Sequence, residues 1–149
     1  LFPARPNDVV TRQANAAFLY RMSGSPAFEP PAVPSFSDVP KTNRFFKEIE
    51  WMKAEGLTFG YSDGTFRPTG TVQRQAVASF LHRAAGSPSV PPGAPTFVDV
   101  PPSHPFFEAI TWAAATGVTT GYSDKTFRPA TPVARQAIAA FFNRYALLD

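Results

Sequence analysis

Three arginines are each predicted to lie in the first turn of a helix, at Arg12, Arg74 and Arg135. The N–H groups and the dipole at a helix N-terminus attract anions, and a guanidinium can hold a carboxylate or phosphate through two parallel hydrogen bonds. The arginines therefore predict repeated anion-binding sites. A competing interpretation is that each arginine pairs with a carboxylate, such as Asp38 or Asp99, and joins one copy of a repeat to the next.

Neutral and aromatic side chains near these arginines could bind sugars. Glutamine amides can donate to and accept from sugar hydroxyls, although an exposed helical glutamine often has no specific partner. Flat aromatic faces suit sugar rings, but a buried indole or phenol needs only a hydrogen-bond partner. The candidate ligand-binding residues are the three arginines together with Gln13, Gln75, Gln136, Trp51, Trp112, Tyr61 and Tyr122.

These candidates recur because the chain contains a repeated sequence. Residues 36–40 (FSDVP) return as 97–101 (FVDVP), and residues 60–63 (GYSD) return as 121–124, each displaced by 61 residues. A shift of 62 residues aligns the second copy with residues 5–26, so we expect the chain to begin inside a copy. Repeated helices that cannot bury their apolar faces alone favour an array with equivalent binding sites over a single catalytic cleft.

The composition excludes several classes of protein. The 149 residues are 44% hydrophobic and include no cysteine, so a disulfide framework and a thiolate metal site are both excluded. No apolar run approaches the roughly 20 residues of a membrane span, and we expect any targeting segment to lie upstream of Leu1. A net charge of +3 favours an anionic partner but lacks the Lys/Arg blocks of a nucleic-acid binder. A basic surface that only maintains solubility is the alternative.

Apolar spacing predicts two kinds of helix. First helices are predicted over residues 45–55 and 106–116, each followed by a glycine that ends it. Second helices are predicted to begin directly after the N-cap residues Asp8, Gly70 and Thr131. Tight turns are predicted between first and second helices, and Pro-rich stretches are predicted to be extended, semi-rigid connectors. The expected fold is mainly α with little strand.

The order of these motifs resembles the S-layer homology (SLH) module. It runs F-x-D-V-P, an aromatic helix, G-Y-S-D-G-T-F-R-P, then V-x-R-Q-A-x-x-x-F-x-x-R, and it covers nearly the whole chain. The R-Q-A form is similar to that common in actinobacterial surface proteins. The resemblance implies tandem helix-loop-helix repeats in a pseudo-threefold arrangement around a helix bundle. It also implies non-covalent attachment of secreted proteins to cell-wall glycopolymers.

The resemblance divides the chain into modules. The predicted organisation is the second half of a first module at 1–24, a Pro-rich linker at 25–34, a second module at 35–86, a second linker at 87–95 and a third module at 96–149. The incomplete first module would leave an apolar face uncovered. We therefore expect a cleaved upstream segment, another chain or a symmetry-related copy to complete it.

The resemblance also implies a ligand. In better-known members a T-R-A-E stretch opens the second helix, and its arginine meets acidic groups of the polymer, often a pyruvylated sugar. Here the arginine matches in every copy, whereas alanine replaces the acidic residue at Ala14, Ala76 and Ala137. The implied partner is an anionic cell-wall polysaccharide, with a pyruvylated sugar as one candidate.

We expect neither catalysis nor a cofactor. His82 and His104 do not recur at equivalent positions, and no nucleophile elbow, phosphate loop or H-E-x-x-H motif is present. Asp63 and Asp124 are predicted to stabilise their own turns, and without acidic neighbours they cannot supply the roughly six oxygens that calcium prefers.

The resulting hypothesis is a non-catalytic module that anchors a larger secreted protein at the cell wall or cell surface of a Gram-positive bacterium. Two alternatives stay open. One is a protein-interaction or inhibitor module that uses the aromatic and Pro-rich surface. The other is a glycan-hydrolysing enzyme fragment, in which carboxylates such as Asp38 and Glu48 approach one another in space.

Overall fold

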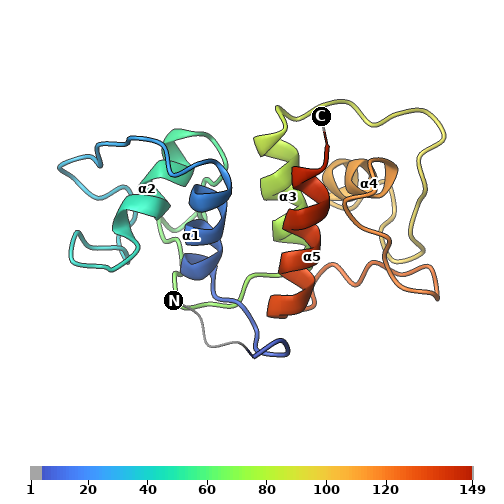
Figure 1. Ribbon diagram of the computed structural model, residues 1–149, viewed down its shortest axis with the longest axis horizontal. Helices are drawn as coiled ribbons and strands as arrows, with labels where there is room; N and C mark the ends of the chain where they lie inside the picture. The colour runs from blue at the N-terminus through green and yellow to red at the C-terminus, as the bar shows by residue number, and fades with distance from the viewer. Residues whose placement is uncertain (1–4, 149) are drawn as a thin grey trace. The chain divides into compact units, whose positions relative to one another are not determined.

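The computed structural model describes residues 5–148, and this part of the chain is mainly helical (Figure 1). Its five helices are α1 (Arg12–Met22), α2 (Phe46–Ala54), α3 (Arg74–Ala84), α4 (Phe107–Ala115) and α5 (Arg135–Ala146). Between residues 5 and 148, extended pairing is confined to isolated antiparallel bridges. The prediction of a mainly α fold with little strand is confirmed. No helix in the described range is long and apolar enough to cross a membrane.

The second helices, α1, α3 and α5, each begin three residues later than predicted. The predicted N-caps Asp8, Gly70 and Thr131 are therefore wrong. The N-caps are Thr11, Gln73 and Ala134. The intervening backbone is extended because it pairs with distant segments, as in the bridge between Thr11 and Thr71. Tertiary hydrogen bonds thus replace what would have been the first helical turn.

The chain divides into two compact units. The first unit is Val10–Val72, in which α1 packs against α2. Its core includes Leu19 from α1 and Ile49 and Met52 from α2, all almost fully buried. Trp51 packs edge-on against Tyr20, with ring centroids 5.3 Å apart.

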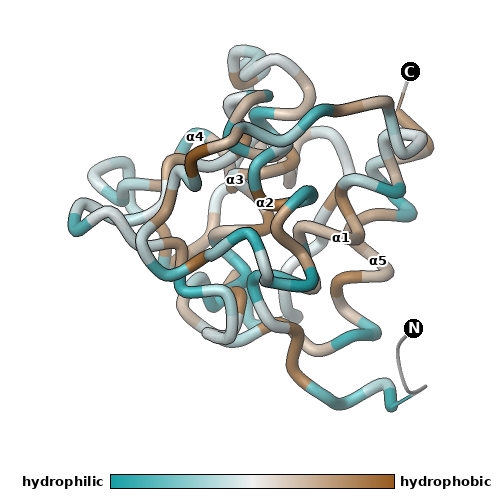
Figure 2. The backbone as a smooth tube through the Cα atoms, turned by 90° about the vertical axis from the view of Figure 1, so that its left-hand side faces the viewer, coloured by the Kyte–Doolittle hydropathy of each residue, from teal (hydrophilic) through white to brown (hydrophobic). Residues whose placement is uncertain are grey.

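The second unit combines the segment ending at Val9 with the chain from Gln73 onward. Here α3 packs against both α4 and α5 (Figure 1). Figure 2 colours part of α4 brown, and Ile110 in this helix is fully buried. Ile138 of α5 and Val77 of α3 are likewise buried.

The compact units differ from the sequence repeats. Each unit joins the second helix of one copy to the first helix of the next, because α1 packs on α2 and α3 packs on α4. The modules assigned at 1–24, 35–86 and 96–149, which extend beyond the described residues at both ends, stay predictions, as does their pseudo-threefold arrangement.

The predicted turns join α2 to α3 and α4 to α5. The Tyr61 N–H donates to the Thr65 carbonyl oxygen at 2.8 Å, and the Tyr122 N–H donates to that of Thr126 at 2.9 Å. Lys125 occupies the position of Gly64 in the other copy and takes a φ of +65°, so this turn forms even where a residue other than glycine must adopt a left-handed backbone.

Candidate functional site

The first arginine–tyrosine cluster consists of Arg12, Tyr61 and Arg67 in the first unit. Arg12 is the first residue of α1, and its Nε–H group donates to the carbonyl oxygen of Phe66 at 2.7 Å. Its Cζ atom lies 4.9 Å from the centroid of the Tyr61 ring and 4.7 Å from that of Phe66. Arg12 is only 8% exposed. The guanidinium is thus fixed between a helix N-terminus and the turn of the next sequence copy.

The second arginine–tyrosine cluster, Arg74, Tyr122 and Arg128 in the second unit, repeats this geometry. The Nε–H group of Arg74 donates to the carbonyl oxygen of Phe127 at 2.7 Å. Its Cζ atom lies 4.8 Å from the Tyr122 centroid and 4.6 Å from the Phe127 centroid, and the residue is 7% exposed. Because two separate segments build the same geometry, the arrangement is a property of the repeat.

A second guanidinium covers each tyrosine ring. The Cζ atom of Arg67 lies 3.6 Å from the Tyr61 centroid, and that of Arg128 lies 3.7 Å from the Tyr122 centroid. Both arginines have left-handed φ angles, +60° and +58°, where residues other than glycine are uncommon. Strained residues of this kind cluster at functional sites. Neither arginine was predicted as a site residue from the sequence, although both lie in the repeated F-R-P motif.

A half-buried aspartate holds the backbone of each strained arginine in place. Asp38 accepts the N–H groups of Phe66 and Arg67, both at 2.8 Å, and Asp99 makes the same two bonds in the other copy. Within residues 5–148 the ion pair with Arg12 that the sequence suggested for Asp38 is therefore not formed. Arg12 does join two sequence copies, as that interpretation required, but through a carbonyl group.

Burial and like charge both act on the inner arginines. Burial lowers the pKa of Arg12 from its usual value, Tyr61 raises it, and the charge on Arg67 lowers it further. The same causes lower the pKa of Arg74. Guanidinium groups nevertheless stay protonated in proteins. Each cluster therefore concentrates two positive charges around one tyrosine, which favours an anionic ligand.

Each cluster lies on a turn stabilised by its own aspartate. Asp63 Oδ1 accepts the backbone N–H of Thr65 at 3.1 Å and its hydroxyl at 2.6 Å, as the sequence predicted, and Asp124 makes the same contacts in the other copy. These hydrogen bonds lower the pKa of Asp63 below its usual value. The Asp63 carboxylate also pairs with Arg67 at 3.5 Å, but both side chains are exposed and the pair contributes little to stability.

A pocket of about 320 Å³ adjoins the second cluster. Arg74 and Tyr122 line it together with Gln136, Phe141 and Arg144 of α5. The volume falls at the lower end of the range for small-ligand pockets. Arg144 adds a cation that the sequence analysis did not select, and Gln136 adds an amide. The lining therefore suits a small acidic group that also carries hydroxyls.

The three predicted glutamines have different surroundings. Gln13 is half-buried and accepts from the Asn43 side-chain amide at 3.4 Å. Gln75 is also half-buried and donates to the side chain of Gln73 at 2.5 Å. Gln136 is exposed and donates to the Asn7 side chain at 3.3 Å. Of the three, Gln136 is the one that the structure places at the pocket beside Arg74.

The predicted aromatic ligand residues differ in exposure: the tryptophans are buried, whereas Tyr61 is exposed. Trp51 and Trp112 are 4% and 3% exposed, and their indoles pack against Tyr20 and His82 in the interiors of the two units. Tyr61 is 37% exposed, but arginine guanidiniums lie over its ring. The tyrosine rings therefore pack against arginine guanidinium groups, and the tryptophans belong to the core.

Arg135 shares the backbone framework of the other two arginines. Its N–H group donates to the carbonyl oxygen of Asp8 at 2.9 Å, as that of Arg12 donates to Gly70 at 2.8 Å and that of Arg74 donates to Thr131 at 3.0 Å. The side chain of Arg135 is half-buried.

The repeats match a known family of domains. The S-layer homology domain matches residues 35–78 and 96–139, which together cover more than half of the chain. The chain belongs to the S-layer homology domain family. SLH domains are non-catalytic modules that generally anchor proteins to the cell wall. The match includes the turns and the first residues of α3 and α5, and so contains most of both clusters.

A curated relative agrees with this assignment. The SLH chain is 27% identical over 151 residues to Cell surface glycoprotein 1 of Acetivibrio thermocellus. The alignment covers 94% of this chain but only 6% of the relative. The family and the relative both point to a protein of the cell surface.

Proposed function

We propose that this SLH chain anchors a larger secreted protein to the cell wall of a Gram-positive bacterium by binding an anionic wall polysaccharide. The observation that carries the proposal is the duplicated cluster, in which a helix-start arginine and a left-handed arginine share one tyrosine. A duplicated cationic site suits a polymer, because repeated acidic groups on one chain can engage both clusters and gain avidity.

The inner arginines keep donors for a ligand. The hydrogen bond from Arg74 to Phe127 uses the Nε–H group, while the terminal N–H groups of the guanidinium remain for other partners. The pocket beside Arg74 brings Gln136 and Arg144 to the same place. A sugar that bears a carboxylate would meet cations through its acid and the Gln136 amide through its hydroxyls. A pyruvylated sugar is one candidate of this kind.

The proposal assigns binding to the arginines and to Gln136, and it leaves the tryptophans as core residues. Arg135 is proposed as a third binding arginine, because its backbone is held in the same way as those of Arg12 and Arg74. The tyrosines contribute by orienting guanidinium groups, which stack well on aromatic faces.

Purified wall sacculi provide the test, compared before and after selective extraction of their secondary polymers. The informative variant is Arg67→Gly with Arg128→Gly, because glycine is favourable at a left-handed φ and this change removes both outer guanidiniums without imposing strain. Each lost charge-assisted hydrogen bond is worth about 1.5–3 kcal/mol, so binding should weaken roughly tenfold or more.

The matched control is Lys125→Gly, which also removes an exposed cation from a left-handed position in the turn but lies outside the second cluster. Wall binding by this variant should stay close to that of the unchanged chain. Equal losses in the control and the double variant, or binding that survives extraction of the polymers, would contradict the proposal.

A further inference from the structure

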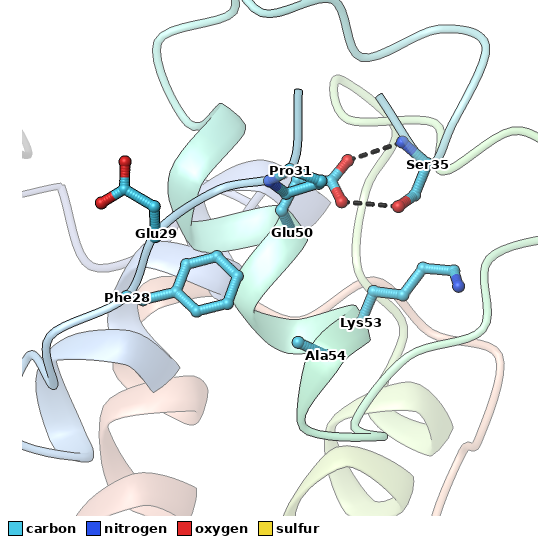
Figure 3. Close-up of a pocket in the computed structure, with 7 residues that line it drawn as sticks. All are labelled: Phe28, Glu29, Pro31, Ser35, Glu50, Lys53 and Ala54. Carbon is cyan, nitrogen blue, oxygen red and sulfur yellow. Dashed lines mark hydrogen bonds between the residues drawn. The ribbon is translucent and has the colours of Figure 1, made fainter. Parts of the chain in front are cut away.

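A second pocket, of about 330 Å³, lies in the first unit between the Pro-rich connector and α2 (Figure 3). Phe28, Glu29 and Pro31 line it from the connector, Ser35 lines it directly after the connector, and Glu50 and Lys53 line it from α2. None of these residues belongs to an arginine–tyrosine cluster. The two carboxylates and one ammonium group give this pocket a net negative character, opposite to that of the clusters.

Glu50 is a buried carboxylate held by neutral donors. It is 2% exposed and accepts the Ser35 N–H at 2.8 Å and the Ser35 hydroxyl at 2.6 Å, the two bonds drawn in Figure 3. In the part of the chain between residues 5 and 148, no ion pair to Glu50 is formed. A buried charge without a countercharge is costly, yet each carboxylate oxygen can accept a further hydrogen bond. A cation that entered the pocket would supply the missing countercharge.

The fold itself does not require this charge. The repeat places Thr111 of α4 at the position of Glu50, and Thr111 is also buried, so an equivalent helix packs without a carboxylate there. Ala114 takes the position of Lys53, and the connector at residues 87–95 contains no acidic residue. The charged groups of the pocket are therefore specific to one copy of the repeat, whereas structural residues such as Phe66 and Phe127 recur.

We propose that this pocket binds an amino sugar whose amine is not acetylated. The ammonium group would contact the Glu50 carboxylate, and the apolar face of the sugar ring would lie against the Phe28 ring, which faces the pocket in Figure 3. The Ser35 hydroxyl donates to Glu50, and its oxygen would accept a hydrogen bond from a sugar hydroxyl. That the sugar comes from the wall glycan rests on the proposed function, whereas the binding of the sugar to this pocket does not depend on it.

Glucosamine and N-acetylglucosamine form the matched probe pair, because acetylation removes the positive charge and leaves the ring. Titration of the isotopically labelled chain, followed by NMR at the amides of Ser35 and Ala54, should show saturable binding of glucosamine. N-acetylglucosamine should bind about 10-fold to 100-fold more weakly, the range expected for loss of a charged hydrogen bond.

Four variants separate binding from folding. Glu50→Gln should weaken glucosamine binding at least about tenfold. Because the Glu50→Gln change also alters the contact with Ser35, a second variant is needed. Glu29→Gln removes a negative charge from an exposed residue of the pocket, and it should also weaken glucosamine binding. Lys53→Met should tighten binding, since it removes a like charge from the pocket. Glu55→Gln, on an exposed residue just beyond α2, is the control and should leave binding unchanged.

Two results would overturn the inference. Equal binding of the acetylated and free sugars would remove the role of the ammonium group. Tighter binding of Nα-acetyl-lysine amide than of glucosamine would assign the pocket to a peptide amine. The proposed function is tested separately, because Arg67→Gly with Arg128→Gly should weaken wall binding while leaving glucosamine binding intact.

Discussion

The Nε–H group of Arg12 and the carbonyl oxygen of Phe66 form a 2.7 Å hydrogen bond between two copies of the repeat. Arg74 and Phe127 form its counterpart. The arginine that opens each helix is therefore an internal support as well as a candidate ligand residue. The two interpretations available from the sequence, ligand binding and attachment between copies, are compatible because one guanidinium has enough donors for both.

Replacing Arg74 by alanine should lower the stability of the chain. The change removes the bond to Phe127 and the contacts with the Tyr122 and Phe127 rings from a residue that is 7% exposed. A charge-assisted hydrogen bond and a cation–π contact together predict a loss of about 2–3 kcal/mol in the free energy of unfolding. Urea denaturation would measure it. Arg44→Ala, which removes an exposed arginine 5.3 Å from the Phe45 ring, should change the same quantity by less than about 1 kcal/mol.

Two glycines in one turn should respond very differently to alanine. A Cβ atom at Gly60 would lie 2.5 Å from a ring carbon of Phe36 and 2.6 Å from the Thr65 carbonyl oxygen, whereas one at Gly64 would meet nothing within 4 Å. Both glycines have positive φ, so Gly64→Ala should cost about 1 kcal/mol from backbone strain alone. Gly60→Ala adds a steric clash and should cost about 3 kcal/mol or more. Similar melting temperatures for the two variants would show that the Phe36 ring moves aside freely.

Local sequence patterns predicted that the helices exist, but they did not predict where the second helices begin. Apolar spacing and terminal glycines predicted α2 and α4 to within one residue at each end. Capping rules placed the second helices too early, because they ignore long-range bonds such as that from the Val72 N–H to the Val10 carbonyl oxygen. Local preference therefore yields to tertiary pairing at these starts.

The candidate site was predictable only where its residues repeat. The helix-start arginines stood out from their spacing, and Arg67 and Arg128 could have been selected from the same repeat. The sequence could not show whether Trp51 and Trp112 are buried in the core or exposed to a ligand, because an aromatic side chain on a helix can pack in a core or against a sugar ring. The pocket at Glu50 depends on the path of the connector that brings Ser35 onto α2, and no local pattern specifies that path.

Acid should weaken both turns through their aspartates. The pKa values of Asp63 and Asp124 lie below the usual value of 3.8, chiefly because of hydrogen bonds from Thr65 and Thr126. The unfolded chain binds protons at these groups more tightly, so their contribution to stability is fully present above the usual pKa and is lost as the pH falls through the lower folded value. Asp63→Asn with Asp124→Asn should therefore reduce the change in melting temperature between pH 7 and pH 3. An unchanged acid response in the double variant would assign that response to other carboxylates.

Asn15 on α1 is fully buried, and both its side-chain oxygen and nitrogen lack a hydrogen-bond partner among the described residues. The repeat places Val77 and Ile138 at the same position of α3 and α5, where both are buried apolar residues. An unsatisfied buried amide costs about 1–3 kcal/mol, so Asn15→Val should raise the free energy of unfolding by a similar amount.

The reverse substitution, Val77→Asn, provides the matched comparison for Asn15→Val. It should destabilise the chain by at least as much, because it buries an amide and also removes apolar contacts. Urea denaturation of both variants would measure the two changes. A loss of stability in Asn15→Val would mean that the Asn15 amide does have a partner in solution, such as an ordered water molecule.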